Sequence, residues 1–258
     1  MLKLTAGVAV ATMVLSILAP IAASADSPSG TLVYHFTFSS NQNVSAKDSA
    51  NPAEDYTGNA PTNSGAGALS QGSGSSTYEG SLTDKGTITV NIVRQQPDGA
   101  LVVMVSEQGE NVRRAPPAEC VVYGNTNVIC DPNKTVYTEE YTLLRFLGGN
   151  FVDPNALDAK RHWQIVQDSP SLNVKADYTI DSNNNGIMQI GETRSLRNPK
   201  GGSLTTDIQA KIGYDFKRAV PLSVDEYTQQ RHDNGVVGTS LTIYQTTLNL
   251  VSDSTAKT

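Results

Sequence analysis

Apolar and polar residues alternate along several stretches of this chain, and this period of two constrains its fold more than any other feature. In residues 86–93, apolar side chains at positions 88, 90 and 92 alternate with Thr89 and Asn91. Successive side chains of a strand point to opposite faces, so this pattern predicts a half-buried strand. Residues 97–99, Pro-Asp-Gly, predict a turn, and residues 100–106 predict the returning strand of a hairpin.

The last third of the chain has the same character. Residues 223–226, Ser-Val-Asp-Glu, fit a helix capping box. Alternation through residues 223–231 and the turn at residues 232–235 instead favour a polar strand in a hairpin. Including a β-branched and aromatic stretch near the N-terminus, we expect strands at residues 31–38, 172–180, 187–190, 205–216, 223–231 and 240–251.

One helix is predicted near the middle of the chain. Thr138 is suited to cap it, and the acidic residues at 139 and 140 suit the positive end of the helix dipole. An apolar residue every three or four positions from 141 to 148 predicts a face that packs on a sheet, and Gly148-Gly149 ends the helix. Asp153-Pro154 opens a second, shorter helical candidate that runs towards His162 and Trp163.

These elements predict a mainly β fold with one or two helices, in which an antiparallel curved sheet or half-barrel packs on a helix. The alternative is a β-sandwich. Residues 26–258 are expected to form a single β-rich domain, long enough for a sizeable core. Residues 39–77 are dominated by Ser, Gly, Asn, Ala and Pro, which predicts a flexible low-complexity loop with little to bury.

The first 25 residues have the organisation of a secretory signal peptide. Lys3 precedes a nearly uninterrupted apolar run at residues 6–21, and Ala-Ser-Ala at residues 23–25 suits signal peptidase. The run is short and close to this cleavage pattern, so we expect no stable membrane insertion after cleavage. The first mature residue is then Asp26 and not a cysteine, which argues against a lipid anchor. We expect an exported, soluble protein, either periplasmic or extracellular.

The charge of the chain bears on its partners. It has 25 acidic and 19 basic residues, a formal net charge of −6, and no basic stripe. Attraction to phosphates is the main source of affinity for nucleic acids, so we expect no nucleic-acid partner. Acidity by itself indicates solubility and names no ligand, and no feature of the sequence indicates an oligomeric state.

Cys120 and Cys130 are the only cysteines. The residues between them predict two short strands about a turn at residues 124–126, which places the cysteines opposite one another at a spacing that suits a disulfide. An oxidising compartment favours this bond. A redox pair is the weaker interpretation because the CxxC spacing is missing, and a zinc site because histidines are not nearby. We predict a structural disulfide.

Residues 181–192 match the pattern D-x-[DN]-x-[DN]-G-x5-E and so resemble the calcium-binding loop of EF-hand proteins. This resemblance implies calcium as a cofactor, with ligands from Asp181, Asn183, Asn185, the Ile187 carbonyl, Gln189 directly or through water, and Glu192. The flanking residues predict strands in place of EF-hand helices. The competing interpretation is a β-hairpin whose Asn185-Gly186 turn needs positive φ angles, which requires no metal.

Catalytic motifs are sparse in this sequence. The GxSxG and HExxH patterns are absent, and the three histidines are spread along the chain at His35, His162 and His232. Asp215 and Asp233 are acids suited to orient a histidine, but the sequence does not bring a serine, a histidine and an acid together. We therefore assign no catalytic residue.

Three functions follow from these features. The favoured one is a non-enzymatic binding or carrier module for an apolar or amphipathic ligand, a small or lipid-like molecule. The second is an extracellular structural or adhesion protein with a weak calcium-binding loop. The third is a secreted hydrolase. The carrier is expected to hold its ligand in a pocket lined by inward strand residues such as Ile88, Val90, Val103, Ile212 and Leu248.

Overall fold

The computed structural model describes residues 30–47, 70–72, 75–110, 114–124, 126–148, 151–152, 161–169, 172–198, 204–233 and 238–254. The signal peptide predicted for residues 1–25 lies outside these ranges. Within them the chain forms twelve strands and one α-helix. They are β1 (Gly30–Lys47), β2 (Ser70–Gly72), β3 (Ser75–Gln95), β4 (Leu101–Gly109), β5 (Arg114–Val122), β6 (Val128–Cys130), α2 (Thr138–Leu144), β7 (His162–Asp168), β8 (Asn173–Asn184), β9 (Ile187–Arg197), β10 (Leu204–Asp215), β11 (Val220–Asp233) and β12 (Gly238–Asp253).

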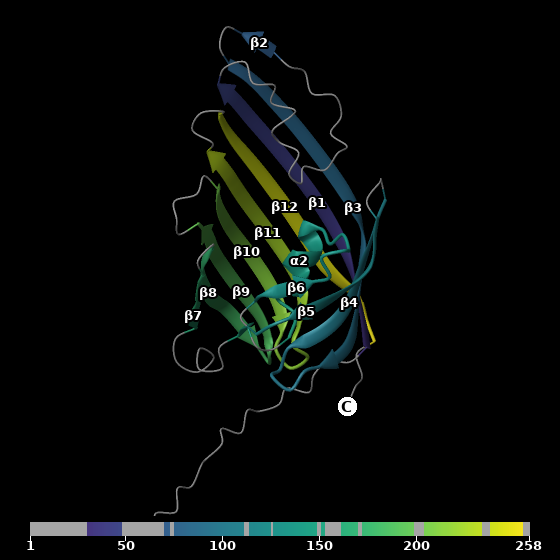
Figure 1. Ribbon diagram of the computed structural model, residues 1–258. Coiled ribbons are helices and arrows are strands. Elements are labelled where there is room, and N and C mark those ends of the chain that lie inside the picture. The colour runs from purple at the N-terminus through teal and green to yellow at the C-terminus, as the bar shows by residue number, and fades with distance from the viewer. Residues whose placement is uncertain are drawn as a thin grey trace, which may run out of the picture.

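The described strands form one open antiparallel sheet. Its order is β6-β5-β4-β3-β1-β12-β11-β10-β9-β8-β7, with β2 paired to β3 beside this path. The sheet curves around α2, which lies on its concave side (Figure 1). The predicted mainly β fold with a curved sheet packed on a helix is therefore confirmed, and the β-sandwich alternative is wrong because one sheet holds these strands. None of the described helical structure is both long and apolar enough to cross a membrane.

The predicted hairpins are present. β3 pairs with β4 around the turn at residues 96–99, and β8 pairs with β9 around a turn in which Asn185 and Gly186 have φ angles of 55° and 94°. β11 confirms the predicted polar strand, and the capping-box helix at residues 223–226 is wrong. β10 and β12 flank β11, so pairing on both edges satisfies its backbone groups in the extended conformation.

The loop predicted at residues 39–77 is wrong where the structure describes this segment. Residues 39–47 continue β1, residues 70–72 form β2, and residues 75–77 begin β3. Residues 39–47 pair with β12 on one edge and β3 on the other. A polar run forms a strand here because two neighbouring strands take up its backbone hydrogen bonds, although the run has few side chains to bury. Residues 48–69 and 73–74 lie outside the described residues.

The predicted helix is present as α2, but it begins differently. Tyr137 is its N-cap, and the backbone N–H of Tyr137 donates to Oε2 of Glu140 at 2.7 Å. The two acidic residues at 139 and 140 are in the first turn as expected, but they are buried. The second helical candidate is wrong at its end, because His162 and Trp163 begin β7. Its residues 153–160 are outside the described part of the chain.

The core fills the space between the concave face and α2. One cross-strand row is entirely apolar, and each of its members is at most 4% exposed: Ile180, Ile190, Ile212, Val224, Leu248 and Phe36. The five residues expected to line a ligand pocket point inward as predicted, but they pack in one core with Leu143 and Leu144 of α2. The expectation that they line a pocket is wrong, because the helix occupies this part of the concave face.

Candidate ligand-binding face

The next cross-strand row marks the limit of the apolar core. Its members are also buried, at most 5% exposed, but two of them are acidic. We call this row the charged row. From β8 to β1 it consists of Tyr178, Glu192, Ala210, Glu226, Thr246 and Phe38.

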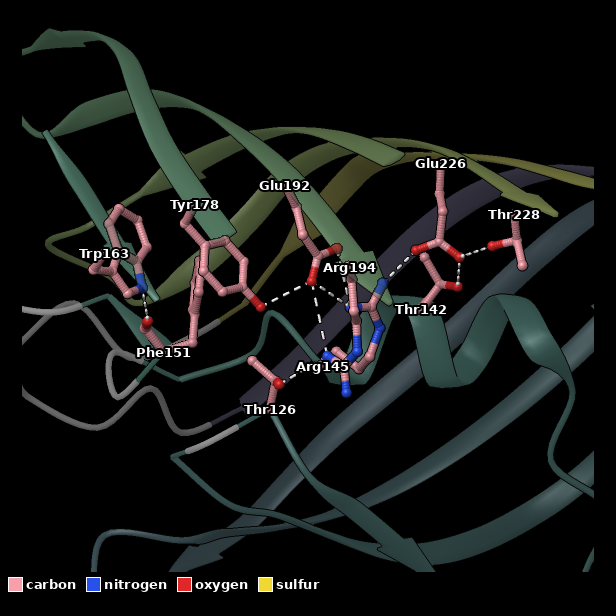
Figure 2. A network of polar contacts seen from close by, with 10 residues as sticks. All are labelled: Thr126, Thr142, Arg145, Phe151, Trp163, Tyr178, Glu192, Arg194, Glu226 and Thr228. Atoms are coloured by element: carbon pink, nitrogen blue, oxygen red, sulfur yellow. Dashed lines mark hydrogen bonds and ion pairs between the residues drawn. The ribbon is translucent and has the colours of Figure 1, made fainter. Parts of the chain in front are cut away.

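Arg145, the C-cap residue of α2, joins the two glutamates of the charged row (Figure 2). Its Nη1 donates to Oε1 and Oε2 of Glu192 at 2.9 and 3.1 Å, and its Nη2 donates to Oε2 of Glu226. Burial lowers the pKa of Arg145, but the two carboxylates together raise it by more than burial lowers it. The guanidinium therefore stays charged. The helix is thus attached to β9 and β11 by buried ion pairs.

Neutral donors complete the coordination of both carboxylates. Oε1 of Glu226 accepts from the hydroxyls of Thr142 and Thr228 at 2.9 and 3.1 Å. Oε1 of Glu192 also accepts from the hydroxyl of Tyr178 at 2.8 Å. Burial, and then the charge of Glu192, raise the pKa of Tyr178, which keeps this donor protonated. All four carboxylate oxygens therefore have partners, as buried charges require.

Arg194 lies beside this network and is bound less completely. Its Nη1 donates to Oγ1 of Thr126 at 2.9 Å and is 3.8 Å from Oε1 of Glu192. Burial, and then the nearby charge of Arg145, lower the pKa of Arg194. Thr126 itself is 2% exposed and has a φ of 63°, a conformation that a β-branched residue rarely adopts.

Beyond the charged row, two further rows of inward residues continue towards the ends of the long strands, which extend past α2 (Figure 1). Except for Thr228, which is buried, these residues are half-buried. We call them the distal face. The first row is Ile208, Thr228, Tyr244, Ser40 and Leu82, and the second is Leu196, Thr206, Gln230, Thr242 and Gln42.

The distal face mixes two kinds of side chain. Leu82, Tyr244, Ile208 and Leu196 are apolar or aromatic, and the others carry hydroxyl or amide groups. Ring centroids of Tyr244 and Phe38 lie 6.1 Å apart, so the face is continuous with the charged row. Such a surface offers apolar contact and hydrogen bonding side by side, and its own members carry no formal charge. Charged residues border it: Arg194 is in register with Ile208, and Asp84 is in register with Phe38 of the charged row.

Two hollows open on the outer side of the sheet. One, of about 380 Å³, is lined mostly by outward residues of β3, β1 and β12 such as Thr37, Lys85 and Thr247, together with the buried Phe38 and Asp84. The other, of about 440 Å³, lies over β3, β4 and β5 and is lined by residues that include Thr87 and Gln108. Most of the residues that line them carry hydroxyl, amide or charged groups, unlike the mainly hydrophobic and aromatic lining of an apolar ligand pocket.

The structure does not assemble the predicted calcium ligands. Asn183 accepts from the backbone of Gly186 at 3.0 Å in the β8–β9 turn, and Asn185 occupies a positive-φ position. Glu192 lies in the interior, bound to Arg145 and Tyr178, and Asp181 and Ile187 are exposed strand residues at the hairpin. Among the residues described, no cluster of three or more His, Cys, Asp or Glu side chains is arranged to hold a metal. The hairpin interpretation explains each of these positions.

Cys120 and Cys130 form the predicted disulfide. They are register neighbours in β5 and β6, with Cα atoms 4.0 Å apart. The bond closes the hairpin that carries Thr126, so it restrains the residue that binds Arg194. The cysteine pattern of the sequence was sufficient to find this element.

The histidines lie apart from the network. His35 is exposed on β1, His162 is on the outer side of β7 with its Nε2 3.8 Å from Asp177, and His232 is half-buried opposite Ser240. Trp163 fills the core as expected: it stacks on Tyr178 at 5.0 Å, and its Nε1 donates to the Phe151 carbonyl at 2.9 Å (Figure 2). The three histidines therefore lie on three separate strands, β1, β7 and β11.

Sequence reasoning missed Arg145, Glu226, Arg194 and Thr126. Two of these residues, Glu226 and Arg194, could have been found from the alternation of side chains along their strands. Glu226 alternates in phase with Val224, and Arg194 alternates in phase with Ile190, so both occupy positions that point to the core. A charged residue in the buried phase of a strand predicts a buried partner.

Comparisons with known proteins place this chain in no family. No family model matches it, and no curated protein matches it. It is similar to a solved structure described as "Lipid-protein interactions in lipovitellin", with a TM-score of 0.41 and 8% sequence identity. The match covers 89% of this chain and 26% of that chain, so this chain spans about a quarter of its length. A likeness at this level supports no conclusion about fold or function.

Proposed function

We propose that this protein is an exported binding or carrier module that holds an amphipathic, lipid-like ligand on the distal face. The observation that carries the proposal is the change along the concave side of the sheet. α2 packs on the apolar row, the two glutamates of the charged row are paired with Arg145, and the two rows beyond it leave apolar side chains half-buried. Half-buried apolar groups on a concave face favour a ligand that removes them from water.

The composition of the distal face favours an amphipathic ligand over a purely apolar one. Leu82, Tyr244 and Ile208 lie in one row that runs from β3 to β10 across five adjacent strands. With strands about 4.8 Å apart, this row spans about 19 Å, which suits one acyl chain laid across the sheet. The hydroxyl and amide side chains of the next row are suited to bind a polar head group or water.

Binding of dodecanol and laurate, measured by isothermal titration calorimetry, tests this proposal. Tyr244→Asp and Ile208→Asp place a charge on the distal face, and each is expected to weaken binding of both probes about 10-fold or more. Ile243→Asp is the matched control, because Ile243 is half-buried on the opposite face of the same strand. Equal effects of Tyr244→Asp and Ile243→Asp, or no binding by the wild-type protein, contradict the proposal.

The proposed export rests on the sequence of residues 1–25. Its test is the N-terminus of the protein recovered from the periplasm or the medium of a producing cell, which is expected to be Asp26. Recovery of the intact chain from the cytoplasm contradicts export. The adhesion protein and the hydrolase have no specific observation in their favour, and neither is proposed.

A further inference from the structure

Arg194 lies beside the buried network and makes fewer contacts with its carboxylates than Arg145 does. Arg145 takes up the carboxylates of Glu192 and Glu226, and the nearest oxygen of Glu192 is 3.8 Å from Nη1 of Arg194. The hydrogen bond of this guanidinium goes to a neutral hydroxyl, that of Thr126. Its Nε and Nη2 donate to no residue within the described ranges. A guanidinium has five N–H donors, so Arg194 has donors left for a ligand.

The position of Arg194 gives a ligand access to these donors. Its side chain is 8% exposed. Of its inward neighbours along β9, Glu192 is 3% exposed and belongs to the charged row, whereas Leu196 is half-buried and belongs to the distal face. Across the sheet Arg194 is in register with Ile208. Arg194 therefore lies in β9 between the buried network and the half-buried distal face.

The guanidinium of Arg194 is also held in place by Thr126. Thr126 is in the hairpin closed by the disulfide of Cys120 and Cys130, where it has a positive φ angle and its Oγ1 accepts from Nη1 of Arg194. Strained residues of this kind persist only where surrounding structure determines them, and they occur at binding sites more often than elsewhere. A guanidinium fixed on one edge presents its remaining N–H groups in the fork geometry that pairs with carboxylate or phosphate.

We infer that Arg194 binds the acidic head group, a carboxylate or a phosphate, of the amphiphile held by the distal face. The inference rests on the proposed function and makes it more specific. The ligand is then an anionic amphiphile whose chain lies along the first row of the distal face and whose charged head group lies at β9. The anion supplies the hydrogen-bond acceptor that the described residues do not.

Laurate and dodecanol distinguish this inference from the proposed function, because they share a chain and differ in charge at neutral pH. The wild-type protein is expected to bind laurate about 10-fold or more tightly than dodecanol, as charge-assisted hydrogen bonds are strong in partly buried sites. Equal affinities overturn the inference and leave the proposed function standing, whereas failure of both probes to bind overturns both. Acetate, a carboxylate without a chain, is expected to bind at least about 100-fold more weakly than laurate. Equal affinities for acetate and laurate overturn the inference that the ligand is an amphiphile whose chain contributes to binding.

Arg194→Met removes the charge and keeps a long side chain. It is expected to weaken binding of laurate much more than binding of dodecanol, and so to abolish the preference for laurate. Arg197→Met is the matched control, because Arg197 is on the same strand but is more exposed and pairs with Asp207. If Arg194→Met binds laurate as the wild-type protein does, the inference is overturned.

A measurement on the wild-type protein avoids any dependence on whether the variant folds. The carboxyl signal of ¹³C-labelled laurate, followed by NMR as the pH falls, reports the pKa of the bound acid. Pairing with Arg194 is expected to hold this pKa below that of free monomeric laurate in the same buffer. A bound carboxyl whose pKa equals or exceeds that of the free acid overturns the inference.

Discussion

Arg145 donates to both carboxylate oxygens of Glu192, a residue 47 positions further along the chain. The contact joins the end of α2 to the middle of β9, at the row where the apolar core stops. A buried ion pair of this kind adds little net stability compared with apolar packing, but removal of one partner is strongly destabilising. The contact therefore attaches the C-terminal end of α2 at the row that borders the distal face.

Replacement of Arg145 tests the importance of this attachment. Arg145→Met leaves the buried carboxylates of Glu192 and Glu226 without their cation, so the free energy of unfolding is expected to fall by about 3–5 kcal/mol in urea denaturation. The exposed pair of Arg197 and Asp207 provides the control, and Arg197→Met is expected to change stability by about 1 kcal/mol or less. A loss of similar size in both variants contradicts the assignment of Arg145 as the central cation.

The disulfide is expected to stabilise the hairpin that carries Thr126. Replacing Cys120 and Cys130 together by alanine opens a loop of 10 residues in the sequence, and chain entropy predicts a loss of roughly 2–3 kcal/mol. The measurement is urea unfolding of this variant beside the oxidised wild-type protein. Reduced wild-type protein is the control, and its free energy of unfolding should match that of the variant. If neither change lowers the free energy of unfolding, the disulfide does not stabilise the hairpin.

Calcium is expected to leave the protein unchanged. The ligand that the sequence motif requires at its last position, Glu192, is bound to Arg145 and Tyr178 in the interior. A ligand that binds only the folded state raises the melting temperature, so scanning calorimetry in millimolar calcium and in a chelator is the measurement. Coinciding transitions are expected. A melting temperature several degrees higher with calcium, lost in Asp181→Ala, supports a metal site at residues 181–192.

High pH is expected to unfold the protein through its buried tyrosines. Burial raises the pKa values of Tyr34, Tyr178 and Tyr214 above the usual value of 10.0. Their hydroxyls are protonated in both states well below this pH, and above it only the unfolded state releases the protons readily. The stabilisation is thus fully present below about pH 10 and is lost as pH rises towards the folded-state pKa values.

Spectrophotometric titration of tyrosine checks this expectation. The three buried tyrosines are expected to ionise together with the loss of far-UV β signal. Their ionisation in a protein that keeps its β signal contradicts the buried hydrogen bonds of Tyr34 with Pro221, Tyr178 with Glu192 and Tyr214 with Gly148.

The local patterns of the sequence were sufficient for most of the sheet. Alternation placed β3 and β11, the cysteine spacing placed the β5–β6 hairpin, and the Asn185-Gly186 dipeptide placed the β8–β9 turn. These features depend on neighbours in the chain or on one cross-strand pair. The extension of β1 through residues 39–47 depends on pairing with β12, more than 190 residues away in the sequence, and so the local composition misled the prediction.

The buried network could not be predicted from the sequence for a related reason. Glu226 and Arg194 occupy buried phases of their strands, but their partners come from elsewhere in the chain: Arg145 follows the helix, and Thr126 lies in the disulfide hairpin. The prediction of a calcium site at residues 181–192 was wrong for the same reason. Its Glu192 matches a ligand position in the sequence, while the register of β9 with β8 and β10 turns this side chain inward.

The location of a bound amphiphile tests the central claim most directly. A laurate analogue with a photoactivatable diazirine on its chain, irradiated with the wild-type protein and mapped by mass spectrometry, labels the residues beside the chain. Labels are expected at inward positions of the distal face, above all Leu82, Tyr244 and Ile208, and excess laurate should prevent them. Labels at outward residues such as Thr37 and Thr247, or labels that laurate does not displace, contradict the account.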